Sequence, residues 1–334
     1  MTLRALGPEH REAWERLAAS RPESGFMQSW AWSEFKELEG YELLRLGLFD
    51  GQALRGGCLA YAYPSPAEAG LVAVPDGPIL DWQGPGAAAD LARLVKAVRG
   101  WAPARRAVAV RVEPRLEALP PALAGLPRAP VDLVPEETWV VPVLPEAAML
   151  AAMKQKARYN ARLSERRGVT VTASTDPADA SEFYFVFEQT ARFQGFDAEP
   201  KSFFLNLAST LMPKLARFHF ARYKGITLAA ALTLRHGSGV TYLYGGHLPL
   251  FRNLMAGTLL HWEILREAAR EGFSAYDLYG YVEPGHPGHP YDRFSRFKEK
   301  LGGGRIRRIG SRDIVLYDRL AEAALAAFAA GEGA

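Results

Sequence analysis

Residues 294–304 combine aromatic side chains, cations and a run of glycines, and within them Lys298 directly follows Phe297. A lysine held between aromatic neighbours can present a localised positive charge to the oxyanion that develops during acyl transfer. The same residue types also fit an exposed lysine on a surface helix. Taken alone, the segment leaves both interpretations open.

Two tyrosines, Tyr242 and Tyr244, precede a Gly245-Gly246 pair in an apolar segment. Side chains repeat every two residues along a strand, so this spacing predicts both rings on one face of a sheet. The glycines would let the chain turn and let a ligand approach the backbone. Paired tyrosines that flank a hydrophobic core have the same pattern.

A possible phosphate loop, residues 252–257, precedes a long predicted helix. An arginine, Arg252, is followed by Gly257 at the expected start of the helix. The pyrophosphate loop of acyl-CoA N-acetyltransferases has the same order of residue types, and its backbone amides bind phosphate. Met255 stands where glycine is expected, and its bulk argues against close approach of a cofactor. CoA-dependent acyl transfer is therefore kept as an alternative.

A basic stripe is expected on a predicted helix over residues 147–167. Its cations are spaced four residues apart, a step that drifts only about 40° around a helix. They are Lys154, Arg158, Arg162 and Arg166. Acidic partners are nearly absent, so the stripe is either a solvated helix face or a surface that follows RNA phosphates.

Other features exclude several classes of protein. The single cysteine, Cys58, cannot form an internal disulfide and reads as a buried strand residue. The loop with His286 and His289 offers few carboxylates, so no metal site is expected. No apolar leader or bilayer-spanning segment is found, and the chain is expected to be cytoplasmic.

Gly and Pro punctuation divides the chain into a pattern of helices and antiparallel strands that occurs twice. This predicts two α/β domains of similar plan with a boundary near residues 145–150. We expect domain 1 over residues 1–146, completed by residues 313–334, and domain 2 over residues 147–312.

The ordered set of motifs resembles the Fem-type (FemABX) aminoacyltransferases of peptidoglycan bridge synthesis. The matching residues are Phe26-Met27-Gln28-Ser29-Trp30, Trp32, Lys36, Gly77-Pro78, Arg111-Val112-Glu113-Pro114, residues 156–171, residues 242–246, Asp277-Leu278-Tyr279-Gly280 and Phe297-Lys298. The resemblance implies an α/β (α+β) chain of two tandem GNAT-like domains with a cleft between them. No long inserted heptad pair is present, so a coiled-coil arm is not expected.

The resemblance also implies roles for residues. Lys298, beside Phe297, would stabilise the charged intermediate when a precursor amine attacks the ester of an aminoacyl-tRNA. Tyr242 and Tyr244 would line the acceptor channel. Glu113 stands where the family often has aspartate before proline, and a part in catalysis is expected with a changed side-chain length.

Lys36 would contact the diphosphate of the precursor, together with a cation near Lys201. The expected partners are an aminoacyl-tRNA and a UDP-linked or lipid-linked muramyl peptide, with no cofactor, no membrane insertion and a monomeric chain. Glycine is weakly preferred as the transferred amino acid. A CoA-dependent N-acyltransferase and a non-catalytic RNA-binding domain pair remain the alternatives.

Overall fold

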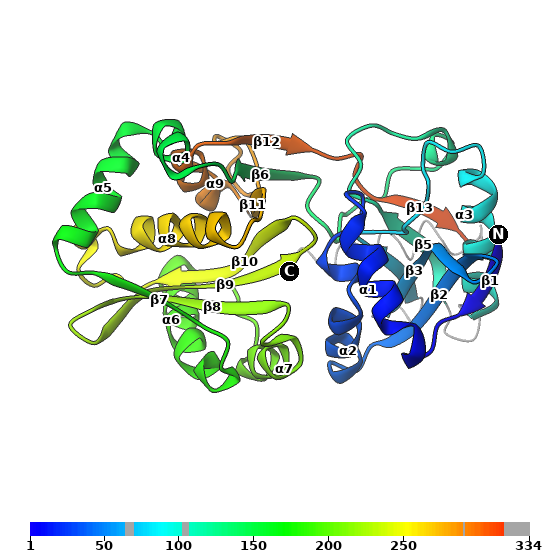
Figure 1. Ribbon diagram of the computed structural model, residues 1–334, viewed down its shortest axis with the longest axis horizontal. Helices are drawn as coiled ribbons and strands as arrows, with labels where there is room; N and C mark the ends of the chain where they lie inside the picture. The colour runs from blue at the N-terminus through cyan, green and yellow to red at the C-terminus, as the bar shows by residue number, and fades with distance from the viewer. Residues whose placement is uncertain (64–69, 102–106, 290, 317–334) are drawn as a thin grey trace. The chain divides into compact units, whose positions relative to one another are not determined.

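The structure is a computed structural model that describes residues 1–63, 70–101, 107–289 and 291–316. The chain divides into two compact units, one made of Met1–Glu136 with Arg307–Ala334 and the other of Glu137–Ile306 (Figure 1). Unit 2 is therefore inserted into the sequence of unit 1. No helix among the described residues has the length and apolar character needed to cross a membrane.

Unit 1 contains a six-stranded sheet in the order β1-β2-β3-β4-β5-β13, in which only β4 and β5 pair in parallel. Its main elements are β1 (Thr2–Ala5), α1 (Arg11–Ser20), α2 (Trp30–Leu38), β2 (Glu42–Asp50), β3 (Ala53–Tyr63), β4 (Gly70–Pro75), α3 (Ala87–Trp101), β5 (Ala107–Glu113) and β13 (Arg312–Val315). Residues 317–334, which include most of the segment expected to complete domain 1, lie outside the described residues.

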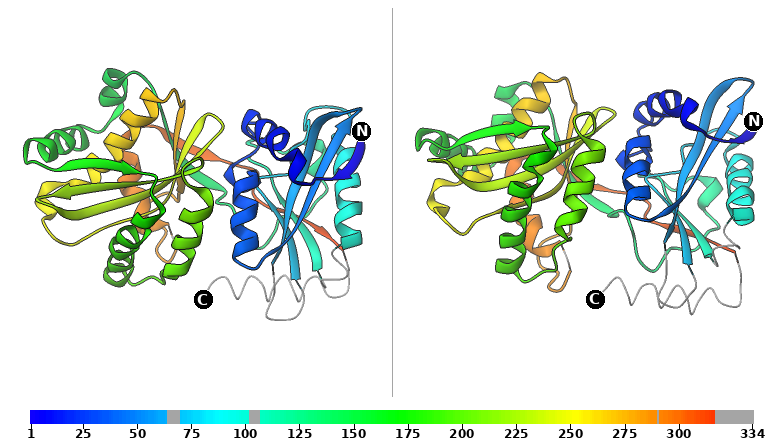
Figure 2. Two further views of the ribbon diagram at one scale, coloured as in Figure 1. Left: turned by 60° about the horizontal axis from the view of Figure 1, so that its bottom comes forward. Right: turned by 90° about the horizontal axis from the view of Figure 1, so that it is seen from below.

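Helices cover both faces of the unit 1 sheet, α1 and α2 on one and α3 on the other (Figure 2). Side chains alternate between the faces along β3. Cys58 packs in the core that α3 covers, while the Tyr61 hydroxyl donates a hydrogen bond to the carbonyl of Met27 beside α2. The expectation of a buried Cys58 is confirmed.

Unit 2 contains a seven-stranded sheet in the order β12-β6-β11-β10-β9-β8-β7. Its elements are β6 (Glu137–Pro142), α4 (Glu146–Ala152), α5 (Gln155–Arg166), β7 (Thr170–Ser174), α6 (Ala180–Gln194), α7 (Lys201–Leu211), β8 (Ala216–Tyr223), β9 (Ile226–His236), β10 (Gly239–His247), α8 (Ala256–Arg270), β11 (Ala275–Gly280), α9 (Asp292–Lys298) and β12 (Gly304–Arg307). Helix α8 covers one face of this sheet, and α6 and α7 cover the other (Figure 1).

Strands β10 and β11 of unit 2 pair in parallel, and they pair only over their first residues, from Gly239↔Ala275 to Thr241↔Asp277. Each strand continues beyond that point without pairing to the other. In unit 1 the corresponding parallel pair, β4 and β5, stays in register as far as Pro75↔Glu113. Ligands of open α/β sheets bind at the carboxyl ends of strands, so the parting of β10 and β11 marks the place where unit 2 could admit one.

Two boundaries differ from those that the sequence predicts. The units part at Glu136/Glu137, before the expected boundary near residues 145–150, because β6 pairs with β11 and so belongs to the second sheet. The helix expected over residues 147–167 is broken into α4 and α5. Met153 is extended and buried, and the amide of Lys154 donates to the carbonyl of Lys300 instead of continuing the helix.

Candidate functional site

Lys298 lies at the end of α9 in unit 2 and is 4% exposed. Its ammonium donates to the carbonyl oxygen of Tyr279 at 3.3 Å and to that of Gly280. Both carbonyls belong to the part of β11 that has separated from β10. The cation is thus held on the part of β11 that does not pair with β10.

Burial lowers the pKa of Lys298 to about 8, and the negative charge of Asp277 opposes this shift. The side chain is mainly a cation at pH 7, and a small rise in pH removes its proton. An ammonium has three N–H donors, and two of them have acceptors within the part of the chain that the structure describes. The third has no acceptor among the described residues.

The two carbonyls point at Lys298 because β11 is irregular between Asp277 and Gly280. Tyr279 has a φ of +59°, which is uncommon for a residue with a side chain. The Asp277 carboxylate holds this conformation, accepting from the amide of Tyr279 at 2.8 Å and from the hydroxyl of Thr138 on β6. Thr138, Asp277 and Tyr279 are therefore positioning residues for the lysine.

The position of Gly280 has no room for a side chain. A Cβ at this position would lie 2.2 Å from the ring of Tyr291, far inside contact distance. The Tyr291 ring in turn lies 5.7 Å from the Nζ of Lys298. The close approach of strand and ring explains why glycine follows Tyr279 in the sequence.

An aromatic wall flanks the lysine on the α8 side of the sheet. The Phe297 ring stacks on the imidazole of His261 with 5.2 Å between centroids, and the Tyr242 ring meets the same imidazole edge-on at 4.9 Å. Burial, and secondarily the charge of Lys298, lowers the pKa of His261 to about 3, so the ring is neutral. His261 was not among the residues expected from the sequence, because a single histidine inside an amphipathic helix carries no distinguishing signal.

The expectation that Tyr242 and Tyr244 share one face is wrong. The pairing of β10 with β9 shifts between them, so that Tyr242 opposes Thr233 and Tyr244 opposes Leu232. This β-bulge inserts one residue and sends the next side chain through to the other face. The Tyr244 ring packs among phenylalanines of α6 and α7, namely Phe187, Phe203 and Phe204.

Two of the four cations in the basic stripe have partners within the protein. Lys154 precedes α5 and pairs with Glu299, and Arg158 donates to the carbonyl of Leu150 at the end of α4. Arg162 and Arg166 are exposed on α5, and no carboxylate among the described residues pairs with them. The free cations are therefore those toward the carboxyl end of α5.

The two cations expected to bind the precursor belong to different units. Lys201 is the exposed first residue of α7 in unit 2. Lys36 lies on α2 of unit 1 and is half-buried, with its Nζ 3.8 Å from the centroid of the Tyr41 ring. A cation over an aromatic face is attracted to the ring and held in place.

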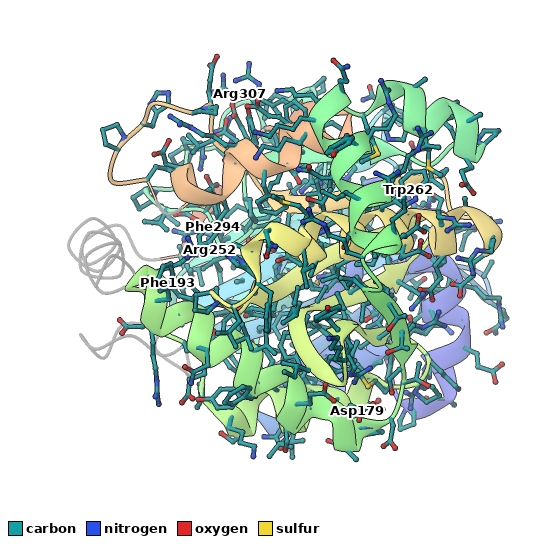
Figure 3. All side chains as sticks on the ribbon, turned by 90° about the vertical axis from the view of Figure 1, so that its left-hand side faces the viewer. Asp179, Phe193, Arg252, Trp262, Phe294 and Arg307 are labelled. Carbon is teal, nitrogen blue, oxygen red and sulfur yellow. The ribbon has the colours of Figure 1, made fainter. Side chains whose placement is uncertain are left out.

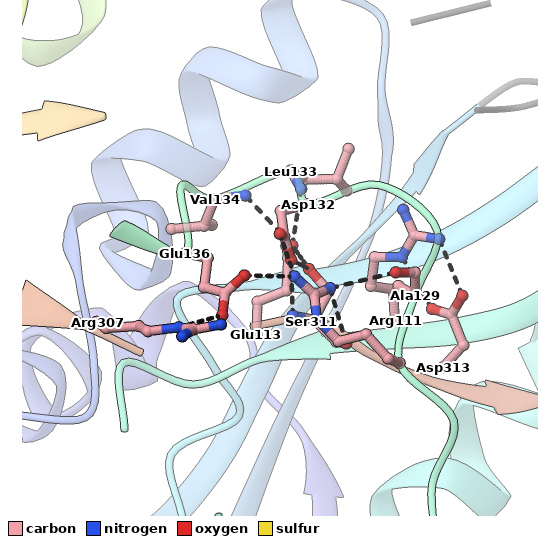
Figure 4. A network of polar contacts seen from close by, with 11 residues as sticks. Arg111, Glu113, Ala129, Asp132, Leu133, Val134, Glu136, Arg307, Ser311 and Asp313 are labelled. Carbon is pink, nitrogen blue, oxygen red and sulfur yellow. Dashed lines mark hydrogen bonds and ion pairs between the residues drawn. The ribbon is translucent and has the colours of Figure 1, made fainter. Parts of the chain in front are cut away.

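Glu113 lies at the end of β5 in unit 1, within a network of polar contacts (Figure 4). Its Oε1 accepts from the amides of Leu133 and Val134, at 2.8 and 3.2 Å, and from the hydroxyl of Ser311. Its Oε2 is buried and has no hydrogen-bond partner among the described residues. Burial raises the pKa of Glu113 to about 7, so the carboxyl can hold or release a proton near neutral pH.

The same end of the sheet contains a buried ion pair that joins β5 to β13. Arg111 is fully buried and donates to both oxygens of Asp313, at 2.8 and 2.9 Å. A bidentate pair of this kind has a fixed geometry. It holds the returning segment of the chain against unit 1 and so fixes Ser311 beside Glu113.

Comparison with known proteins gives two family matches. Residues 10–119 match the model of the FemAB family, and residues 151–299 match that of the acetyltransferase (GNAT) domain. No protein in the search of curated proteins matches the chain.

Among solved structures, the crystal structure of FemX has a TM-score of 0.86 at 18% identity, and the match covers 97% of this chain and 100% of the FemX chain. The C-terminal domain of a putative lysylphosphatidylglycerol synthetase from Agrobacterium fabrum has a TM-score of 0.56 at 14% identity, covering 97% and 96% of the two chains. A tandem GNAT protein from the clavulanic acid biosynthesis pathway has a TM-score of 0.52 at 12% identity, covering 95% and 98%. The prediction of two tandem GNAT-like domains is confirmed, and the described residues contain no coiled-coil arm.

Proposed function

Since residues 10–119 match the model of the FemAB family, we propose that the chain is a Fem-type transferase and that it transfers an amino acid from an aminoacyl-tRNA to the side-chain amine of a peptidoglycan precursor. Glycine is the transferred residue that we test first. The acceptor is a muramyl stem peptide carried on UDP or on a lipid.

In this reaction the amine nitrogen attacks the carbonyl carbon of the aminoacyl ester. The carbonyl oxygen carries a negative charge in the tetrahedral intermediate, the ester C–O bond then breaks, and an amide bond remains. The amine loses a proton, and the ribose hydroxyl of the tRNA gains one. Such a transfer needs oriented substrates and charge stabilisation, without a covalent nucleophile.

The observation that carries the proposal is the buried Lys298 on the part of β11 that does not pair with β10. Two of its donors are fixed on the carbonyls of Tyr279 and Gly280, and the third has no acceptor among the described residues. A preorganised cation in a site of low dielectric stabilises an oxyanion far more than it would in water. The neutral His261, with its low pKa, is unsuited to act as the base.

The test supplies glycyl-, alanyl- and seryl-tRNA, each with a UDP-linked muramyl pentapeptide or its lipid-linked form, and follows label transfer. Lys298→Met should lower the rate at least about tenfold, and by about 10²- to 10³-fold if its donor serves the oxyanion. Lys300→Met is the matched control, since Lys300 is exposed and lies two residues further along the same segment.

An acetyl-CoA arm tests the alternative chemistry, which the GNAT match at residues 151–299 favours. Saturable acetyl-CoA binding together with acetyl transfer to the same acceptor would replace the aminoacyl-tRNA proposal. Absence of transfer from all charged tRNAs, with a working control enzyme, would remove it.

A further inference from the structure

An exposed aromatic patch on unit 2 is used by neither the Lys298 site nor the core. Three large apolar side chains form it, with exposed fractions of 61% for Phe193, 51% for Leu250 and 49% for Phe251. Phe193 is near the end of α6, and the other two precede the short 3-10 turn η6 (Arg252–Leu254) that leads into α8. Apolar groups that gather in this way on a surface mark an interaction site.

A guanidinium lies within the patch. The Cζ of Arg252 stands 4.9 Å from the centroid of the Phe193 ring, and the labelled side chains of both residues lie close together in Figure 3. On the other side of the turn, the Phe251 ring meets the ring of Tyr223 at 5.9 Å. The turn therefore carries one guanidinium on an exposed ring and, at the preceding residue, a second exposed ring.

The local fold presents these side chains to solvent. Helix α6 buries Phe183, Phe187 and Ala191, and Phe193 lies outside that apolar stripe. Phe251 has a left-handed backbone conformation, with a φ of +49°. Such a conformation is unfavourable for a bulky residue and is kept where the surroundings or the function require it.

Positive charge continues from the patch onto α5. Arg167 donates to the carbonyl of Asn253 at 2.6 Å and so ties the turn to the end of that helix. Arg162 and Arg166 are exposed on the same helix, and Lys224 lies over the Tyr223 ring at 5.4 Å. Aromatic faces interleaved with cations are the pattern that binds single-stranded nucleic acid, because bases stack on rings and cations contact phosphates.

We propose that Phe193, Phe251 and Arg252 form a stacking platform for the unpaired nucleotides at the 3′ end of the donor RNA, with Arg162 and Arg166 on the phosphates of the adjoining stem. This inference rests on the proposed function, since it assigns a place to the RNA part of the donor. A lipid surface would also accept apolar side chains and cations. The guanidinium stacked on Phe193 and the free cations on α5 fit a polyanion that carries flat bases better.

The experiment measures, by fluorescence anisotropy, how tightly the full chain binds two RNA hairpins that carry no amino acid. The hairpins share one stem, and only one of them carries an unpaired 3′ end. Base stacking on an aromatic ring strengthens binding about 5- to 150-fold per base, so the hairpin with the unpaired end should bind more tightly by at least about fivefold. Phe193→Ala and Phe251→Ala should each reduce this preference, and Phe193→Tyr should keep it.

Phe185→Ala is the matched control, because Phe185 lies on the same helix and is 54% exposed. It should leave the preference unchanged. Arg166→Gln should weaken both hairpins alike and reduce the salt dependence of binding. The circular dichroism spectrum of each variant checks that the fold is kept.

Equal binding of the two hairpins by the wild type would overturn the platform, as would an equal effect of Phe185→Ala and Phe193→Ala. Binding to anionic phospholipid vesicles that depends on Phe193, while the hairpin preference does not, would assign the patch to a membrane and also overturn the proposal. If the preference for an unpaired end is found but no charged tRNA supports transfer, the platform stands and the proposed reaction fails. If a charged tRNA supports transfer but the chain does not prefer the hairpin with the unpaired end, the proposed reaction stands and the platform fails.

Discussion

Replacing Lys298 with methionine should change how the stability of the protein depends on pH. In the folded protein the pKa of Lys298 is lowered from 10.5 to about 8, chiefly by burial. Between these two values the unfolded chain binds the proton and the folded chain does not. The free energy of unfolding therefore rises with pH across this window and is independent of Lys298 titration below it.

The magnitude follows from the size of the shift. Each pKa unit corresponds to about 1.36 kcal/mol, so a shift of about 2.5 units gives about 3 kcal/mol of stability gained between pH 8 and pH 10.5. The full amount applies because the side chain is only 4% exposed, so solvent screens it little. Lys298→Met has no group to titrate there and should lack this gain.

The assay is urea denaturation of the wild type and the variant at several pH values from 7 to 10.5. Other groups that titrate in this range are common to both proteins, so the difference between the two free energies isolates Lys298. This difference should move by about 3 kcal/mol in favour of the wild type as the pH rises. Parallel pH profiles for the two proteins would show that Lys298 keeps its ordinary pKa and that burial does not tune this cation.

Three further changes test other parts of the structure. Burial raises the pKa of Glu113 from 4.5 to about 7, so between these values the folded wild type binds a proton that the unfolded chain lacks, and its free energy of unfolding falls by about 3 kcal/mol as the pH rises. Glu113→Gln should remove this fall. The same pH dependence of urea denaturation in both proteins would contradict the prediction. Asp313→Asn should destabilise unit 1 by about 3–5 kcal/mol, because it leaves the buried charge of Arg111 without its anion; a shift below about 1 kcal/mol in urea denaturation would refute the role of the pair. Gly280→Ala should displace the Tyr291 ring and the carbonyl that Lys298 contacts, and should lower the transfer rate at least about tenfold; full activity would show that the ring can move at no cost.

The tandem plan could be predicted from the sequence because it depends on local patterns. Apolar alternation along strands such as β5 and glycine stops after helices such as Gly272 act within a few residues of chain. The order of the motifs then indicated the family. The break between α4 and α5 had no such signal, because neither Met153 nor Lys154 is a residue that stops helices.

The candidate site was harder to predict because it depends on irregular backbone. The bulge between Tyr242 and Tyr244 reverses the face of every later side chain on β10, and only a local pair of glycines hints at it. The role of Asp277 arises from Thr138, a residue on a distant strand. Contacts between segments so far apart in sequence depend on sheet order, which periodicity does not reveal.

The insertion of unit 2 within unit 1 has a consequence for synthesis of the chain. Strand β13, which closes the unit 1 sheet against β5, is among the last described residues to leave the ribosome. All strands of unit 2 emerge earlier, since β12 ends at Arg307. The second sheet can therefore be complete while the first still lacks an edge strand and the Asp313 partner of a buried Arg111. During translation, the unit that begins first is thus the unit that finishes last, and its β5 edge stays open to wrong pairing until β13 emerges.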